Sequence, residues 1–453
     1  MKGCQLILAR FVARAARPLR GARAGALVSG AVLLLGGWAA ARAEDAAARI
    51  QRLAREVTPA VVAWRRDFHA HPEPSNREQR TARIVAEALR AMGADDVKTG
   101  VARHGVVASI RGRKPGDVVA LRADMDALAI RERTGLAFAS QNDGVMHACG
   151  HDAHTAILLG AARVLVQMRD ELPGTVRLLF QPAEEGAPLG EEGGAKRMIK
   201  EGALDNPTPS AIFGLHVSTE LKAGQVGYRF GATHASVDRF RVTLAGKQSH
   251  AAFPWHGEDP IVAMAHVITA IQTIPSRHVD ARRPVVVSVG IAQAGTAWNI
   301  IPGEAVLEGT VRTHDAKVRQ RVLEYFRRIV ENTAVAHGTR ATILLDDYGP
   351  PVWNSPELGK QMLPTLAVVA GQASVVEIEP IMGGEDFSHY AERIPGFFLA
   401  LGVADPAAPP GSVAHVHTPQ FVVDEAALPV GVRLMASLAI DYLRAGGGGK
   451  RVR

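Results

Sequence analysis

The sequence predicts an α/β protein with a largely parallel central sheet, together with an inserted α+β domain of the ferredoxin-like type. Apolar, strand-like runs alternate with helical stretches, which is typical of parallel sheets covered by helices. Between residues 234 and 345 the order changes to strand-helix-strand-strand-helix-strand, which is the order of the split βαβ unit. The chain has 453 residues, too many for one compact core.

The first 43 residues have the layout of a secretory signal peptide. Lys2 and five arginines up to Arg23 precede the apolar run ALVSGAVLLLGGWAA (26–40), and Ala41-Arg42-Ala43 offers a small-x-small cleavage site. An uncleaved membrane anchor is the alternative, but an apolar run of about 15 residues is short for a span that needs about 20. We expect a periplasmic or secreted mature protein, with no stable membrane association after cleavage.

Charge and cysteine content narrow the function. The net charge is +7, and residues 1–43 carry seven Lys and Arg and no Asp or Glu, so the mature chain is close to neutral. This gives no reason to expect nucleic-acid binding. Of the two cysteines, Cys4 lies in the signal, so Cys149 has no partner for an internal disulfide. A free thiol in an exported protein needs protection, by burial or by a metal.

The predicted catalytic domain begins at residue 44 and is interrupted after residue 233. Hydrophobic periodicity and apolar runs define its elements. Helices are expected over 57–75 (ending near His71-Pro72), 76–94 and 155–168, and strands over 118–123, 175–181 and 211–217.

The inserted domain is predicted over 234–345, and the first domain resumes over 346–445, with a flexible tail at 446–453. The insert contains strands at 237–246, 285–295, 304–314 and 340–348, and helices at 259–274 and 318–338.

Acidic and imidazole side chains follow three of the predicted strands. Asp124 and Asp126 follow the first, Glu184 and Glu185 follow the second, and His216 ends the third. In open α/β sheets, sites form at the carboxyl ends of the strands. An Asp after a strand is often only a helix N-cap, and a lone His is more often structural than a ligand. Taken together, these acidic and imidazole residues favour a functional site at this edge of the sheet.

The segment HACGHDAH (147–154) adds Cys149, His151 and His154 to this set. Thiolate and imidazole suit zinc and similar divalent metals. Cys149 could also act as a nucleophile, although its neighbours make it a better ligand. The sequence contains no G-x-S-x-G elbow, no H-E-x-x-H and no phosphate-binding loop.

Eight motifs in order carry a resemblance to a known family. They are RADMDAL, MHACGHDAHT, QPAEEG, GLHV, GKQSHAAFP, NIIP, GGEDF and HTPQF. The series resembles the amidohydrolase branch of the di-metal aminoacylase and carboxypeptidase family, which includes hippurate hydrolase and the plant auxin-conjugate hydrolases. The resemblance covers about residues 57–445.

The resemblance implies a metallopeptidase-type catalytic domain that binds two divalent ions, zinc or manganese, with cobalt or nickel as alternatives. It implies Glu184 as the general base and Asp126 as the acid that supports the site behind the ligands. The inserted domain would be a lid that forms a homodimer, with His250 reaching the partner's active site. The metal ligands that it implies are Cys149, His151, Glu185, His216 and His417.

Substrate contacts are expected from Asn299 and Arg312 of the lid. The implied reaction is hydrolysis of a small-molecule N-acyl amino acid to a carboxylate and a free amino acid. A carboxypeptidase or dipeptidase on the same scaffold is the alternative. A non-catalytic periplasmic binding protein is a third reading, but such a protein would be expected to have lost Glu184 or a ligand.

Overall fold

The computed structural model describes residues 26–188, 190–409 and 411–447. Packing divides the chain into two units, Met1–Arg49 and Ile50–Arg453, and the features below belong to the second unit. Residues 1–25 of the predicted signal lie outside the described part of the chain, while the residues from Ala26 onward begin the long helix α1 (Ala26–Ala70). That helix ends just before His71-Pro72, as predicted.

The larger sheet has eight strands in the order β1-β2-β4-β3-β5-β16-β6-β15. Its central strands β4, β3, β5 and β16 run parallel, and antiparallel pairs occur at β1–β2, β2–β4 and β16–β6. The prediction of a largely parallel sheet is confirmed. Its strands are β1 (Asp95–Val101), β2 (Gly105–Arg111), β3 (Lys114–Asp124), β4 (Pro173–Gln181), β5 (Ala211–Lys222), β6 (Val226–Tyr228), β15 (Val375–Glu377) and β16 (Gly396–Ala404).

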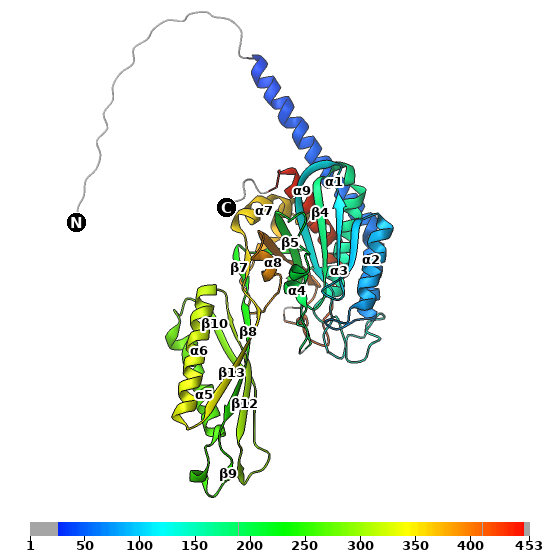
Figure 1. The fold of residues 1–453 in the computed structure, drawn as a ribbon. Helices are drawn as coiled ribbons and strands as arrows, with labels where there is room; N and C mark the ends of the chain where they lie inside the picture. The colour runs from blue at the N-terminus through cyan, green and yellow to red at the C-terminus, as the bar shows by residue number, and fades with distance from the viewer. Residues whose placement is uncertain (1–25, 189, 410, 448–453) are drawn as a thin grey trace, which may run out of the picture. The chain divides into compact units, whose positions relative to one another are not determined.

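Helices cover both faces of this sheet (Figure 1). On one face, Ile212 of β5 packs in a cluster with residues of α4 and α8. On the other face, the ring of Phe213 contacts Tyr442 of α9. Helix α9 also packs against α3. Neighbouring residues of a strand point to opposite faces, so the apolar run of β5 is buried on both sides. Besides α1, the helices are α2 (Gln79–Met92), α3 (His151–Gln167), α4 (Gly194–Lys200), α7 (Pro356–Ala370), α8 (Ser388–Ala391) and α9 (Leu428–Arg444).

The helix at the C-terminal end of the chain is apolar. Among the described residues, one helical segment, Glu425–Arg444, is long and apolar enough to cross a membrane, and 72% of its apolar window is buried inside the protein. It packs against α3 and α7, so its apolar composition is accounted for by the core.

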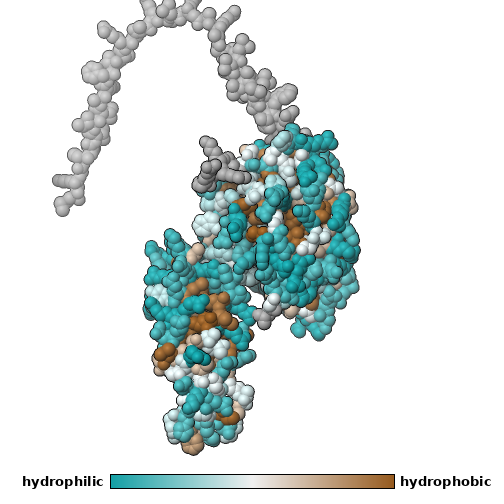
Figure 2. Space-filling view, viewed as in Figure 1, coloured by the Kyte–Doolittle hydropathy of each residue, from teal (hydrophilic) through white to brown (hydrophobic). Residues whose placement is uncertain are grey.

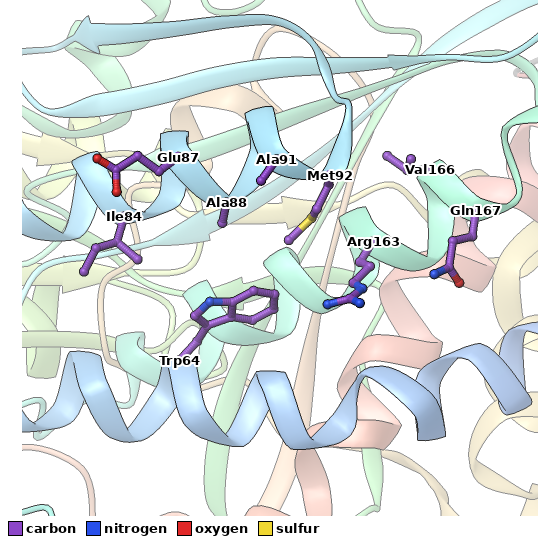
Figure 3. A pocket seen from close by; sticks show the side chains of 9 residues that line it. All are labelled: Trp64, Ile84, Glu87, Ala88, Ala91, Met92, Arg163, Val166 and Gln167. Atoms are coloured by element: carbon purple, nitrogen blue, oxygen red, sulfur yellow. The ribbon is translucent and has the colours of Figure 1, made fainter.

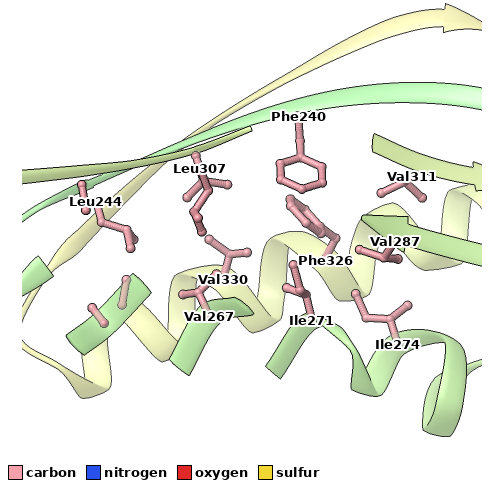
Figure 4. Packing of buried hydrophobic residues seen from close by; sticks show 14 of the residues in the cluster. Phe240, Leu244, Val267, Ile271, Ile274, Val287, Leu307, Val311, Phe326 and Val330 are labelled. Atoms are coloured by element: carbon pink, nitrogen blue, oxygen red, sulfur yellow. The ribbon is translucent and has the colours of Figure 1, made fainter. Parts of the chain in front are cut away.

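The inserted region, called the lid below, folds in the predicted strand-helix-strand-strand-helix-strand order. Its four-stranded antiparallel sheet has the order β10-β12-β8-β13. It has its own hydrophobic core, in which the rings of Phe240 and Phe326 lie 4.6 Å apart (Figure 4). Its elements are β8 (Ser236–Ala245), α5 (Pro260–Ile271), β10 (Val285–Ala294), β12 (Glu304–Thr313), α6 (Ala316–Ala336) and β13 (Arg340–Gly349).

Two short strand pairs complete the fold. One pair, β9 (Ser249–His250) with β11 (Ile300–Ile301), belongs to the lid. The other is β7 (Gly231–His234) with β14 (Val352–Asn354). The predicted domain boundaries remain predictions.

Candidate metal centre and general base

The five predicted metal ligands lie together at the carboxyl ends of the central strands. Cys149 Sγ is 3.3 Å from His216 Nε2 and 3.2 Å from His417 Nε2. The donor atoms form two overlapping sets, Cys149-His151-His216 and Cys149-Glu185-His417, each within 4.8 Å. Because both sets contain the thiol, the arrangement offers two neighbouring positions for a cation.

Unusual backbone conformations bring these residues to one place. Gly150, with φ of 87°, precedes the first helical residue His151, and a Cβ at Gly150 would lie 2.4 Å from Cγ2 of Val217. Only glycine therefore allows this turn to lie against β5. His417 has φ of 63°, which is rare for a residue with a side chain. Such conformations are typical of functional sites.

Three observations show that these side chains fit divalent metal ions. His151 Nε2 and Glu185 Oε1 are buried without a hydrogen-bond partner among the described residues, although His417 Nε2 lies 3.2 Å from the latter. Burial and the nearby Glu185 raise the pKa of the Cys149 thiol well above its usual value, so a cation is needed to stabilise the thiolate. Sulfur, imidazole and carboxylate together suit zinc and related ions.

Asp126 lies beside the predicted ligands. Its Oδ1 is 3.2 Å from His151 Nδ1, and its Oδ2 accepts hydrogen bonds from Ser75 Oγ at 2.7 Å and from the Glu185 amide at 3.0 Å. An ionised carboxylate only accepts, so Nδ1 of His151 donates and Nε2 is left for the site. Asp126 thus orients two of the predicted ligands.

Glu184 and Glu185 lie in a turn, so their side chains do not diverge as neighbouring side chains of an extended strand would. Ala183 before them has φ of 53°, and this reverses the chain after β4. Both carboxylates consequently face the same histidine: Oε2 of Glu184 is 3.9 Å and Oε1 of Glu185 is 4.0 Å from His151 Nε2.

The environment of Glu184 suits a group that accepts and returns a proton. The Tyr348 hydroxyl donates to the main-chain carbonyl of Glu184 and lies 3.3 Å from its Oε1. Burial, followed by the charges of Glu385 and Glu185, raises the pKa of Glu184 well above its usual range. A general base works best when its pKa is close to the operating pH.

His216 was predicted to lie at the end of a strand, but the structure places it inside β5. The strand continues to Lys222, but its pairing with β3 stops at Gly214, so His216 lies beyond the edge of that neighbour. Its Nδ1 donates to the Val217 carbonyl at 2.7 Å, which leaves Nε2 toward Cys149. Burial lowers its pKa well below the usual value and keeps the ring neutral, as a metal ligand requires.

His154 of the HACGHDAH segment is a structural residue. Its Nδ1 donates to Asp124 at 2.6 Å, and its Nε2 accepts the Val217 amide at 2.9 Å. Both ring nitrogens of His154 are therefore occupied by hydrogen bonds within the protein. His151, in the same turn of the helix, differs because its Nε2 has no such partner among the described residues.

A buried ionic network lies beside Glu184, and its central residue, Arg122, was not predicted from the sequence. Arg122 of β3 is completely buried and donates to Asp124 at 2.6 Å and to Glu385 and Asp386 at 2.9 Å each. The signal was available, because Arg122 interrupts the apolar run VVALRAD. The network holds the GGEDF segment against β3. The two acids of that segment, Glu385 and Asp386, lie next to Glu184.

The three predicted lid residues are not brought to this cluster. His250 is exposed on β9, and its Nδ1 accepts the amide of Ala252 at 3.0 Å. The Asn299 carbonyl accepts the Ala251 amide at 3.0 Å, and Arg312 Nη1 donates to the Met382 carbonyl at 3.0 Å. In the described part of the chain, none of the three forms a hydrogen bond or ion pair with the predicted ligands or Glu184.

A cavity of about 550 Å³ lies between α1, α2 and α3 (Figure 3). Its lining contains none of the predicted site residues, so the cavity and the candidate metal centre are different places. The lining residues are Trp64, Ile84, Glu87, Ala88, Ala91, Met92, Arg163, Val166 and Gln167.

Comparison with known proteins gives consistent matches over most of the chain. The model of peptidase family M20/M25/M40 matches residues 120–441. An N-acetylcysteine deacetylase of Bacillus subtilis is 41% identical over 84% of this chain and 97% of its own length. An N-acyl-L-amino acid amidohydrolase of Geobacillus stearothermophilus is 44% identical over 68% of this chain and 81% of its own. A crystal structure of a Bacillus subtilis dinuclear metal-binding peptidase of the M20 family aligns with a TM-score of 0.72 and 38% identity, covering 86% of this chain and 99% of that one.

Proposed function

The chain belongs to peptidase family M20/M25/M40, and from that membership we propose that it is a metal-dependent amidohydrolase that hydrolyses N-acyl amino acids. The products would be a carboxylate and a free amino acid. The observation that carries this proposal is the cluster of five donor side chains around Cys149 with the buried Glu184 beside it. Relatives named as deacetylases and amidohydrolases of N-acylated amino acids support the substrate class.

Each side chain of the cluster has a role in this proposal. Cys149, His151, Glu185, His216 and His417 would hold two divalent ions. When bound, such ions lower the pKa of a water molecule and polarise a carbonyl group. Glu184 accepts the proton of the attacking water and delivers it to the departing amine. Asp126 keeps His151 in the tautomer that leaves Nε2 for the site. The mixed ligand set supports zinc or manganese, with cobalt or nickel as alternatives.

The proposal includes a homodimer formed through the lid. Figure 2 shows apolar side chains gathered on the lid around α5 and α6, where Ile261 and Val262 are 41% and 45% exposed. A patch of this kind is typical of a protein interface. His250 makes no contact with the cluster of its own chain, so a second copy would have to receive it. There it would donate to the oxygen of the scissile carbonyl as charge develops, with Asn299 and Arg312 available to the substrate.

Export is proposed on the N-terminal sequence alone. The basic segment, the apolar run at 26–40 and Ala41-Arg42-Ala43 support a cleaved signal and a periplasmic or secreted enzyme.

A carboxypeptidase is the alternative activity. A Saccharolobus solfataricus relative that is 38% identical over 88% of this chain is named a thermostable carboxypeptidase. A non-catalytic binding protein has no support, because Glu184 and all five ligand positions are present.

One panel assay tests the activity. Metal-loaded protein is given N-acetyl, N-benzoyl and indole-acetyl amino acids, blocked peptides with a free C-terminus, and dipeptides, and the released amine is measured. We expect turnover of one or more N-acyl amino acids that disappears with chelator and returns with metal. Faster cleavage of the blocked peptides would assign the carboxypeptidase activity instead. Absence of turnover on every compound would contradict the proposal.

A further inference from the structure

We propose that Glu78 is a positioning residue, which fixes the turn that carries Glu184 and Glu185. This inference rests on the proposed function, because it acts through the candidate general base. Glu78 was not predicted from the sequence and belongs to no ligand set.

The geometry around Glu78 points to the turn. Its side chain is completely buried, and Oε1 accepts two main-chain hydrogen bonds, from Ala183 at 2.8 Å and from Asn76 at 3.0 Å. Both donors have positive φ, 53° for Ala183 and 60° for Asn76. Neither is glycine, so each conformation costs free energy that the surrounding contacts must offset. One carboxylate oxygen therefore holds two strained amides together.

The turn is held residue by residue, and Glu78 supplies the first contact. The amide of Ala183 donates to Glu78, the carbonyl of Glu184 accepts from Tyr348, and the amide of Glu185 donates to Asp126. Asp126 also orients His151, and Tyr348 also contacts the carboxylate of Glu184. Of the three, Glu78 is the one that makes no hydrogen bond to Glu184 or to a predicted metal ligand.

A purely structural role as a cap of α2 does not explain Glu78. It is the residue before the helix, but its side chain makes no capping hydrogen bond. The free amides at the start of α2 are instead bound by Glu73, whose carboxylate accepts from Arg80 at 2.9 Å and from Thr81 at 2.8 Å. Glu73 thus provides a matched control, since it also accepts two main-chain hydrogen bonds without contacting the turn.

The surroundings of the second carboxylate oxygen of Glu78 indicate how replacement by glutamine would affect the turn. Oε2 is buried without a hydrogen-bond partner among the described residues. Burial and the nearby Asp126 raise the pKa of this carboxyl to about 8. Glutamine keeps the accepting oxygen and removes the buried charge of the carboxylate. Glu78→Gln should therefore preserve the turn, while Glu78→Ala leaves two buried amides unpaired.

The test compares Glu78→Ala, Glu78→Gln and Glu73→Ala in full-length enzyme. We expect kcat to fall by about tenfold or more in Glu78→Ala, with KM changed by less than about threefold, because a displaced base weakens catalysis more than binding. Glu78→Gln should stay within about threefold of wild type in kcat, and so should Glu73→Ala despite its loss of stability. If Glu78→Ala does not fold, Glu78→Asp replaces it, because its shorter side chain withdraws the acceptor.

Hydrogen exchange of the metal-free protein gives a readout that is independent of activity. The peptide spanning 181–186 should exchange faster in Glu78→Ala than in wild type. Its exchange rate in Glu73→Ala should equal that of wild type. Unchanged exchange of that peptide in Glu78→Ala would overturn the inference, as would equal losses of kcat in Glu78→Ala and Glu73→Ala. Faster exchange in Glu78→Ala, in an enzyme whose Glu184→Gln variant is fully active, would confirm that Glu78 holds the turn and contradict the proposed role of Glu184.

Discussion

Arg122 should be among the most costly single residues to replace in this fold. Its side chain is fully buried and donates to three carboxylates at 2.6 to 2.9 Å, and it also donates to Gln181 Oε1 at 3.0 Å. Methionine fills much of the same volume, so Arg122→Met removes the charge and leaves little cavity. Removing one partner of a buried ion pair costs about 3–5 kcal/mol, and here three acids lose their partner at once. We expect the free energy of unfolding to fall by about 4 kcal/mol or more.

Urea unfolding of metal-saturated protein, followed by circular dichroism, measures this loss. Arg52→Met is the matched control, because Arg52 pairs with Glu56 on the surface, with side chains 60% and 55% exposed. That control should change stability by less than about 0.5 kcal/mol. A loss below about 1 kcal/mol for Arg122→Met would refute the reasoning, since it would place the network in an environment far more solvated than its burial indicates.

Three further predictions concern the metals, the pH dependence and the lid. Cys149→Ala should lower the metal content of loaded protein below that of wild type in elemental analysis, because both ligand sets contain the thiol. Burial lowers the pKa of His69, but the charge of Asp152 and the hydrogen bonds to Asp152 and Glu132 outweigh it and raise the pKa to about 9. The stability from this imidazolium is present below about pH 6.5 and lost as pH rises through 9, by up to about 1.4 kcal/mol per pH unit. Unfolding measured across that range should show the slope in wild type and not in His69→Gln. His250→Ala should lose activity, and mixing its subunits with those of Glu184→Gln should restore part of it.

Each of the three has an outcome that contradicts it. Unchanged metal content in Cys149→Ala would remove Cys149 from the ligand set. An equal pH slope in His69→Gln would assign the titration to another group. Mixed dimers that recover no activity would mean that the site is built within one subunit, against the proposed role of His250.

The sequence predicted the parts of the fold that rest on local pattern. The strands 118–123 and 175–181 are apolar runs with buried residues on both faces, and the structure has them as β3 and β4. The alternation of elements in the lid likewise follows from periodicity. The ligands could be predicted because each lies in a short motif that carries the family resemblance, and the structure places their donor atoms close together.

The remainder depends on contacts between distant residues. Arg122 and Glu385 are 263 positions apart, and Glu78 and Ala183 are 105 apart, so neither pair has a local signature. The turn at Glu184 has no clear sequence signal, because its positive φ falls on Ala183, where no glycine marks it. His216 was placed at a strand end because the apolar run stops there, while the strand itself continues along β16 to Lys222.

The most direct test of the proposed catalytic role is the metal content and turnover of Glu184→Gln measured on the same preparation. We expect the variant to bind as much metal as wild type, because Glu185 is the predicted ligand of the turn, and to lose turnover by about 100-fold or more. Glu192→Gln is the control. Glu192 is an exposed acid in the loop after the turn and pairs with Lys200, so its replacement should leave turnover unchanged. Near-normal turnover of Glu184→Gln with its metals bound would contradict the account.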